Sequence, residues 1–480
     1  MTNLTHEELG YMSATELAAK IRKKKLSPMD VTHMFLERIE EVNPKIGAFC
    51  TVVPELALKD ARKAEIAIMR KEKVGPLHGV PIGIKDLTPT KGIKTTYGSR
   101  LFSDNVPNKD AVAVSRIKSA GAIVLGKTNT PEFGHKSITD NALFGRTKNP
   151  WNTQRISGGS SGGSAASVAA GLVPFAEGTD GGGSIRIPAS ACGVYGLKPT
   201  FGRIPKSDPI NAFSDLNPFL HHGTLSRTVE DAALLYSVMV GPDPTDPFSL
   251  PNTSENIQLA VRNPNLKGLR IAYSSNFGYY EIDTQVQSVM ENAVKVFEFL
   301  GCEVERVNPQ IDNAEEWIYK LFACLFSCRM SAAYSALLPE KEELFDPSFV
   351  KIIRKGLTYS AMDYKAVEIA RSKVWHAFQT IFKDYDLLIA PTLALPPFSI
   401  ELPSPPEING KMINPAHGWA LTSHLNLTGH PAASIPAGFS TDGLPIGMQI
   451  IGRRFDEWNI LRASAAFEEA SPWANYRPNL

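Results

Sequence analysis

The chain has 480 residues and a formal net charge of +1, from 50 lysines and arginines against 49 aspartates and glutamates. A nucleic-acid-binding protein that relies on phosphate contacts would carry a clear basic excess. A disordered protein would be richer in charge than 21% and poorer in hydrophobic residues than 43%. The composition therefore predicts a folded protein and argues against a nucleic-acid partner.

The five cysteines form a sparse, odd-numbered set without a C-x-x-C pair, which favours a reducing cytoplasm. Cys324 and Cys328 lie four residues apart in an apolar stretch, which favours buried packing over a metal site. The uncharged stretch Ile156–Ala176 is long enough to cross a bilayer, but it is built of Gly, Ser and Ala. We therefore expect a cytoplasmic protein without a membrane partner, a metal or a cofactor.

Helical and strand patterns alternate along the chain, which predicts an α/β fold. The expected helices, in chain order, are Ser13–Lys25, Ser27–Val42, Pro54–Lys73, Asp110–Ala120, Ala165–Ala170, Val229–Met239, Thr284–Leu300, Glu315–Leu338, Met362–Phe382 and Trp458–Glu469. The expected strands are Gly79–Lys85, Ala122–Leu125, Leu269–Tyr273, Leu387–Ala390, Ala432–Ile435 and Pro445–Ile451. The proline-rich regions Pro205–Asn217 and Pro391–Pro415 are expected to form rims or lids over a site.

Two short motifs match patterns whose usual context is missing. Gly121–Thr128 fits the phosphate-binding pattern G-x-x-x-x-G-K-T, but the residues AIVL between its glycines favour a strand. Gly158–Gly162 fits the nucleophile elbow G-x-S-x-G, which needs a preceding strand and a late histidine. The preceding residues Trp151–Ser157 are polar and turn-like, so a Ser-His-Asp triad is a minor alternative. The late histidines that could serve it are His417, His424 and His430.

Two Gly/Ser clusters, Gly158–Ser164 and Gly181–Ser184, lie between apolar segments typical of a core, which argues against flexible linkers. A rigid Gly-Gly-Gly-Ser turn can point several N–H groups at one place beside a hydroxyl. Acyl transfer by a nucleophilic serine requires that combination. Lys85 ends a strand with small residues on one side and could act as a buried neutral base, although spacing alone favours a surface lysine.

At these residues the sequence resembles the amidase signature family. The family motifs are G-V-P-x-x-x-K-D, G-K-T-N, G-G-S-S-G-G, D-x-G-G-S-I-R-x-P, G-x-P-A-x-x-x-P-x-G and P-x-G-x-Q-x-x-G. Their matches, in the same order, are Gly79–Asp86, Gly126–Asn129, Gly158–Gly163, Asp180–Pro188, Gly429–Gly438 and Pro445–Gly452.

The resemblance implies a catalytic set of three residues. Ser184 would attack the carbonyl, Lys85 would be the ultimate base, and Ser160 would relay the proton between them. In the family, the peptide bond of the residue matching Ser160 is cis.

The resemblance also implies an oxyanion hole and supporting groups. The oxyanion hole would be formed by the N–H groups of Gly181, Gly182 and Gly183. Many members carry Thr or Gln where this chain has Gly181, so we expect a looser turn there. The residues expected to support the site are Ser161, Asp180 and Arg186, of which Arg186 is more readily structural than substrate-binding. Those expected at the substrate pocket are Phe133, Gly134 and Trp419, each with core packing as the alternative.

The implied fold is one amidase domain over residues 1–480, with a mixed central sheet covered by helices on both faces. Its expected parts are an N-terminal helical segment (1–75), a signature core (76–210), a variable substrate-shaping region (240–420), and C-terminal core strands and a helix (425–470).

The implied activity is hydrolysis of a small neutral carboxamide through a Ser184 acyl-enzyme, with apolar or aryl acyl groups favoured and esters or carbamates as side substrates. Residues 351–359 lack the R-R-I-x-L-G-T stretch of glutamyl-tRNA amidotransferase A subunits, which favours a stand-alone amidase. Such a subunit, and a non-catalytic binding protein on the same fold, are the alternatives. The oligomeric state is left open, with a homodimer as the candidate assembly.

Overall fold

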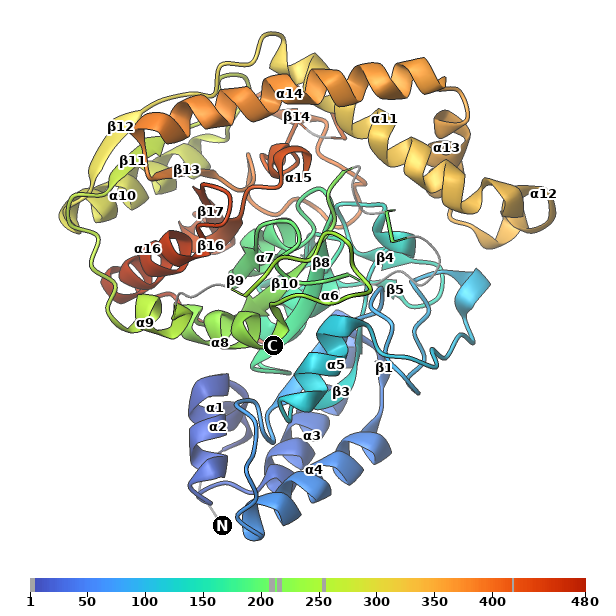
Figure 1. Cartoon of the computed structure of the whole chain (residues 1–480), viewed down its shortest axis with the longest axis vertical. Coiled ribbons are helices and arrows are strands. Elements are labelled where there is room, and N and C mark those ends of the chain that lie inside the picture. Colours follow the sequence, from blue (N-terminus) through green and yellow to red (C-terminus); the bar gives the residue numbers. More distant parts are fainter. Residues whose placement is uncertain (1–4, 207–211, 214–217, 253–255, 417) are drawn as a thin grey trace.

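A mixed sheet of 11 strands forms the centre of the computed structural model, which describes residues 5–206, 212–213, 218–252, 256–416 and 418–480 (Figure 1). In spatial order the strands are β1 (Phe49–Val52), β3 (Ile123–Thr128), β2 (Pro81–Lys85), β8 (Phe175–Asp180), β10 (His221–Ser226), β9 (Tyr195–Lys198), β16 (Ala432–Phe439), β17 (Pro445–Gly452), β13 (Leu387–Pro391), β11 (Arg270–Tyr273) and β12 (Glu303–Arg306). Strand β2 runs parallel to β3 and β8, whereas the central strands from β8 to β13 pair antiparallel. The mixed sheet expected from the resemblance is confirmed.

Helices pack against both faces of the sheet, as the α/β prediction requires. They are α1 (His6–Gly10), α2 (Ala14–Arg22), α3 (Pro28–Ile46), α4 (Pro54–Met69), α5 (Val112–Ser119), α6 (Gly162–Ala169), α7 (Arg186–Cys192), α8 (Val229–Met239), α9 (Ile257–Arg262), α10 (Thr284–Phe299) and α16 (Glu457–Ala470). Helix α3 begins as the sequence indicates, because the Ser27 hydroxyl accepts hydrogen bonds from the backbone N–H groups of Met29 and Asp30. Helices α1 to α4 lie together at the N-terminal end (Figure 1).

A second group of helices lies beside the sheet and forms a cap (Figure 1). Its members are α11 (Ala314–Tyr334), α12 (Leu338–Lys341), α13 (Pro347–Gly356) and α14 (Ala361–Asp384), whereas the short buried helix α15 (His424–Thr428) lies between α14 and the sheet (Figure 1). The expected helix Glu315–Leu338 is interrupted, because α11 ends at Tyr334 and a 3-10 turn precedes α12. Pro339 lies in α12 and has no N–H to continue an α-helical hydrogen-bond ladder. A separate apolar cluster that includes Phe345 and Phe349 fills the space between α11 and α13.

Among the described residues, one helical stretch, Ala314–Leu344, is long and apolar enough to cross a bilayer by length and composition. A core helix of a soluble protein can meet the same criteria, so a single such stretch is weak evidence for a membrane span. Its buried residues Ile318, Leu321 and Leu325 pack into the main hydrophobic core.

Three central strands, β8, β9 and β10, are absent from the sequence prediction. They carry polar residues that are nonetheless buried, among them Glu177, Asp180 and His222, so hydropathy does not mark them.

The interpretation of Trp151–Ser157 as turn-like is also wrong. Residues Asn152–Ile156 form strand β7, which pairs with β6 (Lys148–Asn149) in a two-stranded hairpin outside the central sheet.

The remaining short strands also form hairpins outside the central sheet. They are β4 (Asp140–Asn141), β5 (Gly145–Arg146), β14 (Glu407–Ile408) and β15 (Lys411–Met412). By contrast, the strand expected at Ala122–Leu125, within the phosphate-binding pattern Gly121–Thr128, is present as β3 at Ile123–Thr128. Lys127 of this strand is buried, and its Nζ donates to Thr90 Oγ1 at 2.8 Å. A phosphate-binding lysine would instead face a ligand.

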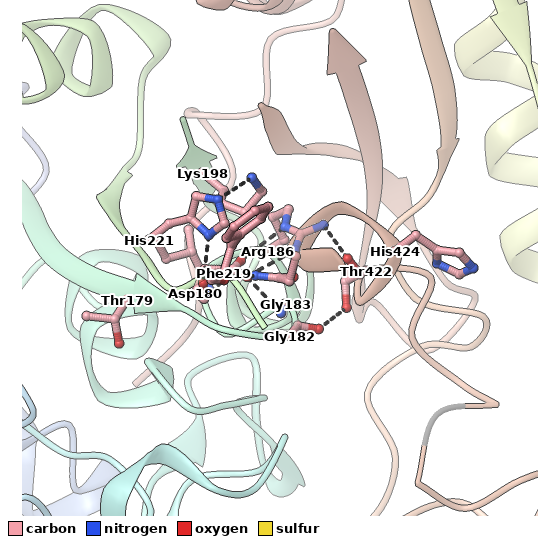
Figure 2. Close-up of polar contacts among 12 residues, drawn as sticks. Thr179, Asp180, Gly182, Gly183, Arg186, Lys198, Phe219, His221, Thr422 and His424 are labelled. Atoms are coloured by element: carbon pink, nitrogen blue, oxygen red, sulfur yellow. Dashed lines mark hydrogen bonds and ion pairs between the residues drawn. The ribbon is translucent and has the colours of Figure 1, made fainter. Parts of the chain in front are cut away.

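The turn after β8 is held by a buried ion pair between Asp180 and Arg186 (Figure 2). Nε and Nη2 of Arg186 each donate to the Asp180 carboxylate at 3.0 Å. Arg186 also donates to the side chains of Gln449 on β17 and Asn426 on α15, both at 2.8 Å. Burial would raise the pKa of Asp180, but the charge and hydrogen bonds of Arg186 hold it well below its usual value. One side chain thus connects the turn to the C-terminal part of the chain.

Replacing Arg186 by methionine should lower the free energy of unfolding by about 3–5 kcal/mol, since it leaves the buried Asp180 carboxylate without its partner. Urea unfolding followed by circular dichroism measures the change. The exposed Arg70, replaced in the same way, is the control and should change stability by no more than about 0.5 kcal/mol. A loss below about 1 kcal/mol in Arg186→Met would contradict this account of the turn.

Candidate active site

A cleft of about 2920 Å³ lies between the strand ends of the sheet and the cap helices. Its lining includes both serines of the expected catalytic set, Ser160 and Ser184, and two of the expected glycines, Gly181 and Gly182. Residues 400–404, from the proline-rich region Pro391–Pro415, lie at its wall, as expected of a rim. The other proline-rich region, Pro205–Asn217, lies largely outside the described residues.

Lys85 is fully buried at the end of β2. Its Nζ lies 2.7 Å from Ser160 Oγ and 2.9 Å from Thr179 Oγ1. Burial lowers the pKa of Lys85 to about 7, although the nearby carboxylates of Glu177 and Asp180 act in the opposite direction. The structure therefore places an amine that can be neutral near pH 7 in contact with a serine hydroxyl. The interpretation of Lys85 as a surface lysine is wrong.

Ser160 lies in the loop between β7 and α6, and the Gly159–Ser160 peptide bond is cis. The next residue, Ser161, connects this loop to a strand and to a turn. Its backbone N–H donates to the carbonyl of Ser184 at 3.1 Å, and its hydroxyl donates to the carbonyl of Thr179 at 3.1 Å. These bonds fasten the loop that carries Ser160 to β8 and to the turn that carries Ser184.

The glycine turn Gly181–Gly183 is closely packed. A Cβ at Gly182 would lie 2.7 Å from Phe322 Cζ of α11, and one at Gly183 would lie 2.1 Å from Thr422 Oγ1. The N–H of Gly183 donates to the Asp180 carboxylate at 2.8 Å and is therefore engaged within the protein (Figure 2). Of the three expected oxyanion-hole donors, Gly181 and Gly182 are the two that line the cleft.

The expected substrate-binding residues Phe133, Gly134 and Trp419 all line the cleft. Phe133 packs against Tyr334 of α11, with ring centroids 4.3 Å apart, and against Phe349 of α13. At Gly134, a Cβ would lie 3.1 Å from Ser160 Oγ, so this position borders Ser160 directly. Trp419 is almost fully buried and also packs edge-on against a neighbouring ring, so it combines core packing with a place in the wall.

The late histidines are engaged elsewhere in the protein. His424 Nε2 lies 2.7 Å from the hydroxyl of Tyr279, and His430 Nδ1 lies 2.8 Å from Thr428 Oγ1. His417 lies outside the described residues. A lysine, not a histidine, thus contacts Ser160. Among the described residues, no group of three or more His, Cys, Asp and Glu side chains could hold a metal ion.

Apart from Asp180, which was expected to support the site, the site residues of β8 and β10 were not predicted from the sequence. Thr179 and Glu177 lie on the face of β8 that meets Lys85, and His222 of β10 lies opposite Thr179 in the antiparallel register. Glu177 and Thr179 lie two residues apart, a spacing typical of one polar face of a strand, but the sequence does not show that this face is buried. Thr422, which donates to the carbonyl of Gly182 at 2.6 Å, lies in a region without a family motif.

Comparisons with known proteins agree with this geometry. The family model described as Amidase matches residues 30–461. An acylamidase from Rhodococcus erythropolis is 38% identical, with 99% of this chain and 98% of that protein covered. The A subunit of the glutamyl-tRNA(Gln) amidotransferase from Carboxydothermus hydrogenoformans is 37% identical, with 98% of this chain and 100% of that protein covered.

A solved bacterial aryl acylamidase of the amidase signature family superposes with a TM-score of 0.92 at 35% identity, with 97% of each chain covered. The chain belongs to the amidase signature family and is a hydrolase that acts on amide carbon–nitrogen bonds.

Proposed function

We propose that this protein is a stand-alone amidohydrolase that uses Ser184 as nucleophile, Ser160 as proton relay and Lys85 as base. The observation that carries the proposal is the contact of 2.7 Å between Ser160 Oγ and a fully buried lysine amine. A base must be unprotonated to accept a proton, and burial supplies that condition. Ser184 lines the same cleft as Ser160, where a substrate carbonyl can reach both.

In the first half-reaction, Ser184 Oγ forms a bond to the amide carbon and its proton passes through Ser160 to Lys85. The carbonyl oxygen becomes an oxyanion, which the N–H groups of Gly181 and Gly182 stabilise. The C–N bond then breaks as Lys85 returns the proton, through Ser160, to the leaving nitrogen. In the second half-reaction, the oxygen of a water molecule forms a bond to the acyl carbon while that water gives a proton to the same relay. The bond between the acyl carbon and Ser184 Oγ then breaks, Ser184 regains its proton through Ser160, and the carboxylic acid leaves and ionises in water.

We further propose that the preferred substrates are small neutral amides with an apolar or aryl acyl group. The aromatic cluster of Phe133, Tyr334 and Phe349 at the cleft supports this choice, because such rings favour apolar and aryl groups over charged ones. Helices α11, α13 and α14 contribute much of the wall, which supports the assignment of 240–420 as the region that shapes the substrate site.

An amidotransferase component that acts on glutamyl-tRNA is the second candidate, because such a protein matches almost the whole chain at 37% identity. The purified chain alone separates the two candidates. A stand-alone amidase hydrolyses simple amides without other proteins, whereas an amidotransferase component depends on partner chains and on glutamine. A homodimer and a cytoplasmic location stay predictions.

A fluorophosphonate should add one adduct to the protein, and peptide mass spectrometry should place it on Ser184. Ser184→Ala should lose the adduct and reduce amide turnover at least about 10³-fold, since the nucleophile is removed. Labelling at another residue, or turnover near the wild-type rate in Ser184→Ala, would contradict the proposed nucleophile. The control is Ser237→Ala, a hydroxyl on α8 outside the cleft lining.

Amide turnover should fall on the acid side of about pH 7, because protonated Lys85 cannot accept the proton of the relay serine. Below that pH, kcat/KM for a neutral amide should decrease about tenfold for each pH unit. The measurement is the pH profile of kcat/KM, with circular dichroism at each pH to confirm that the fold persists. A flat profile between pH 5 and pH 9 would argue against a lysine base.

Benzamide and hexanamide should be hydrolysed at least about tenfold more efficiently than succinamic acid, a difference of about 1.4 kcal/mol in transition-state binding. The physical reason is the cost of placing a carboxylate among the rings around Phe133. Comparison of kcat/KM for the three compounds at one pH is the test. Equal or faster turnover of succinamic acid would contradict the substrate proposal and leave the proposed catalytic set intact.

A further inference from the structure

Glu177 is a fully buried acid on β8 that no step of the proposed mechanism uses. Its Oε2 accepts a hydrogen bond from the backbone N–H of Lys85 at 3.2 Å, and the hydroxyl of Thr88 donates to both of its oxygens at 3.0 and 3.1 Å. Its Oε1 lies 2.7 Å from Nδ1 of His222, which lines the cleft. Glu177 therefore contacts both the backbone of Lys85 and the side chain of His222.

The ionisation of Glu177 fixes the direction of its bond to His222. Burial would raise the pKa of Glu177, but the hydrogen bond from His222 and the charges of Lys127 and Lys85 hold it below its usual value. An ionised carboxylate can only accept hydrogen bonds, so Nδ1 of His222 must donate. The imidazole is thus held with its Nδ1–H directed at Glu177.

A carboxylate beside Lys85 conflicts with the need for a neutral base. Two nearby acids, Glu177 and Asp180, act against the effect of burial and favour a higher pKa for Lys85. Asp180 already has Arg186 as its partner. The Glu177 carboxylate accepts a hydrogen bond from His222 of β10 on one side, and the charge of Lys127 from β3 acts on it from the other. Lys127 also interacts favourably with Asp86 and Cys50 and is repelled by Lys118, so Glu177 is one of several groups that act on its charge.

We propose that His222 is a positioning residue for the Lys85 base and acts through Glu177. By donating to Oε1, His222 holds the carboxylate against the backbone of Lys85 and draws its negative charge away from the amine. This role rests on the proposed function of Lys85 as the base. A purely structural role would also explain the buried pair, but such a role predicts lost stability without a systematic change in the pH profile.

Three single variants and one double variant test the proposal. His222→Phe removes the donor. The acid limb of the pH profile of kcat/KM, along which turnover falls as Lys85 is protonated, should then move to higher pH by about one unit. Glu177→Gln removes the charge and keeps the size, so the limb should move to lower pH by a similar amount. His222→Asn keeps a neutral donor near the position of Nδ1 and should stay close to the wild type. In Glu177→Gln, adding His222→Phe should cause no further shift, because the group through which His222 acts is gone.

The same shifts should appear in the pH dependence of the rate at which a fluorophosphonate labels Ser184. The exposed His33, replaced by asparagine, is the matched control and should leave the limb unchanged. If His222→Phe does not fold, Glu177→Gln alone carries the test.

A folded Glu177→Gln with an unmoved limb would overturn the proposal, as would shifts of Glu177→Gln and His222→Phe in the same direction. Failure of the wild type to label or to hydrolyse amides would instead overturn the proposed function.

Discussion

The buried amine of Lys85 is the constraint on which the rest of the site depends. A lysine in water is protonated at neutral pH and cannot act as a base. Only removal from water, at the end of β2 beneath the cleft, brings the pKa of Lys85 to about 7. The surrounding groups then have to form hydrogen bonds with the amine without giving it a proton. The hydroxyls of Ser160 and Thr179 do so at 2.7 and 2.9 Å, because a hydroxyl can donate to or accept from a neutral amine.

The fold brings these groups together from distant parts of the chain. Lys85 is contributed by the N-terminal third, the two serines by loops around β8, and the supporting Gln449 and Asn426 by the C-terminal strands and helix α15. Because Arg186 binds both of the latter side chains, the glycine turn is fixed by contacts more than 200 residues away in sequence. The cap helices complete the cleft but carry none of the three proposed catalytic residues. This arrangement can allow the substrate site to vary while the chemistry is kept.

Part of this structure was predictable from sequence. The amphipathic helices α8 and α10 agree with their expected bounds within one residue, since their apolar periodicity survives in the fold. The positions of Lys85, Ser160 and Ser184 came from motif resemblance, whereas spacing alone left Lys85 at the surface. Strands β8 and β10 were missed because Glu177 and His222 are polar residues buried by tertiary pairing, which local patterns do not record. The engagement of Gly183 N–H by Asp180 likewise depends on a turn geometry that composition cannot specify.

The most direct test of the central claim is the pKa of Lys85 itself. Protein labelled with ¹³C at the lysine ε-carbons gives a signal whose shift follows protonation, and the signal missing from Lys85→Met assigns the residue. Lys85 should titrate with a midpoint near pH 7, well below the ordinary lysine value of about 10.5. A Lys85 amine that stays protonated up to pH 9 or above would contradict the central claim.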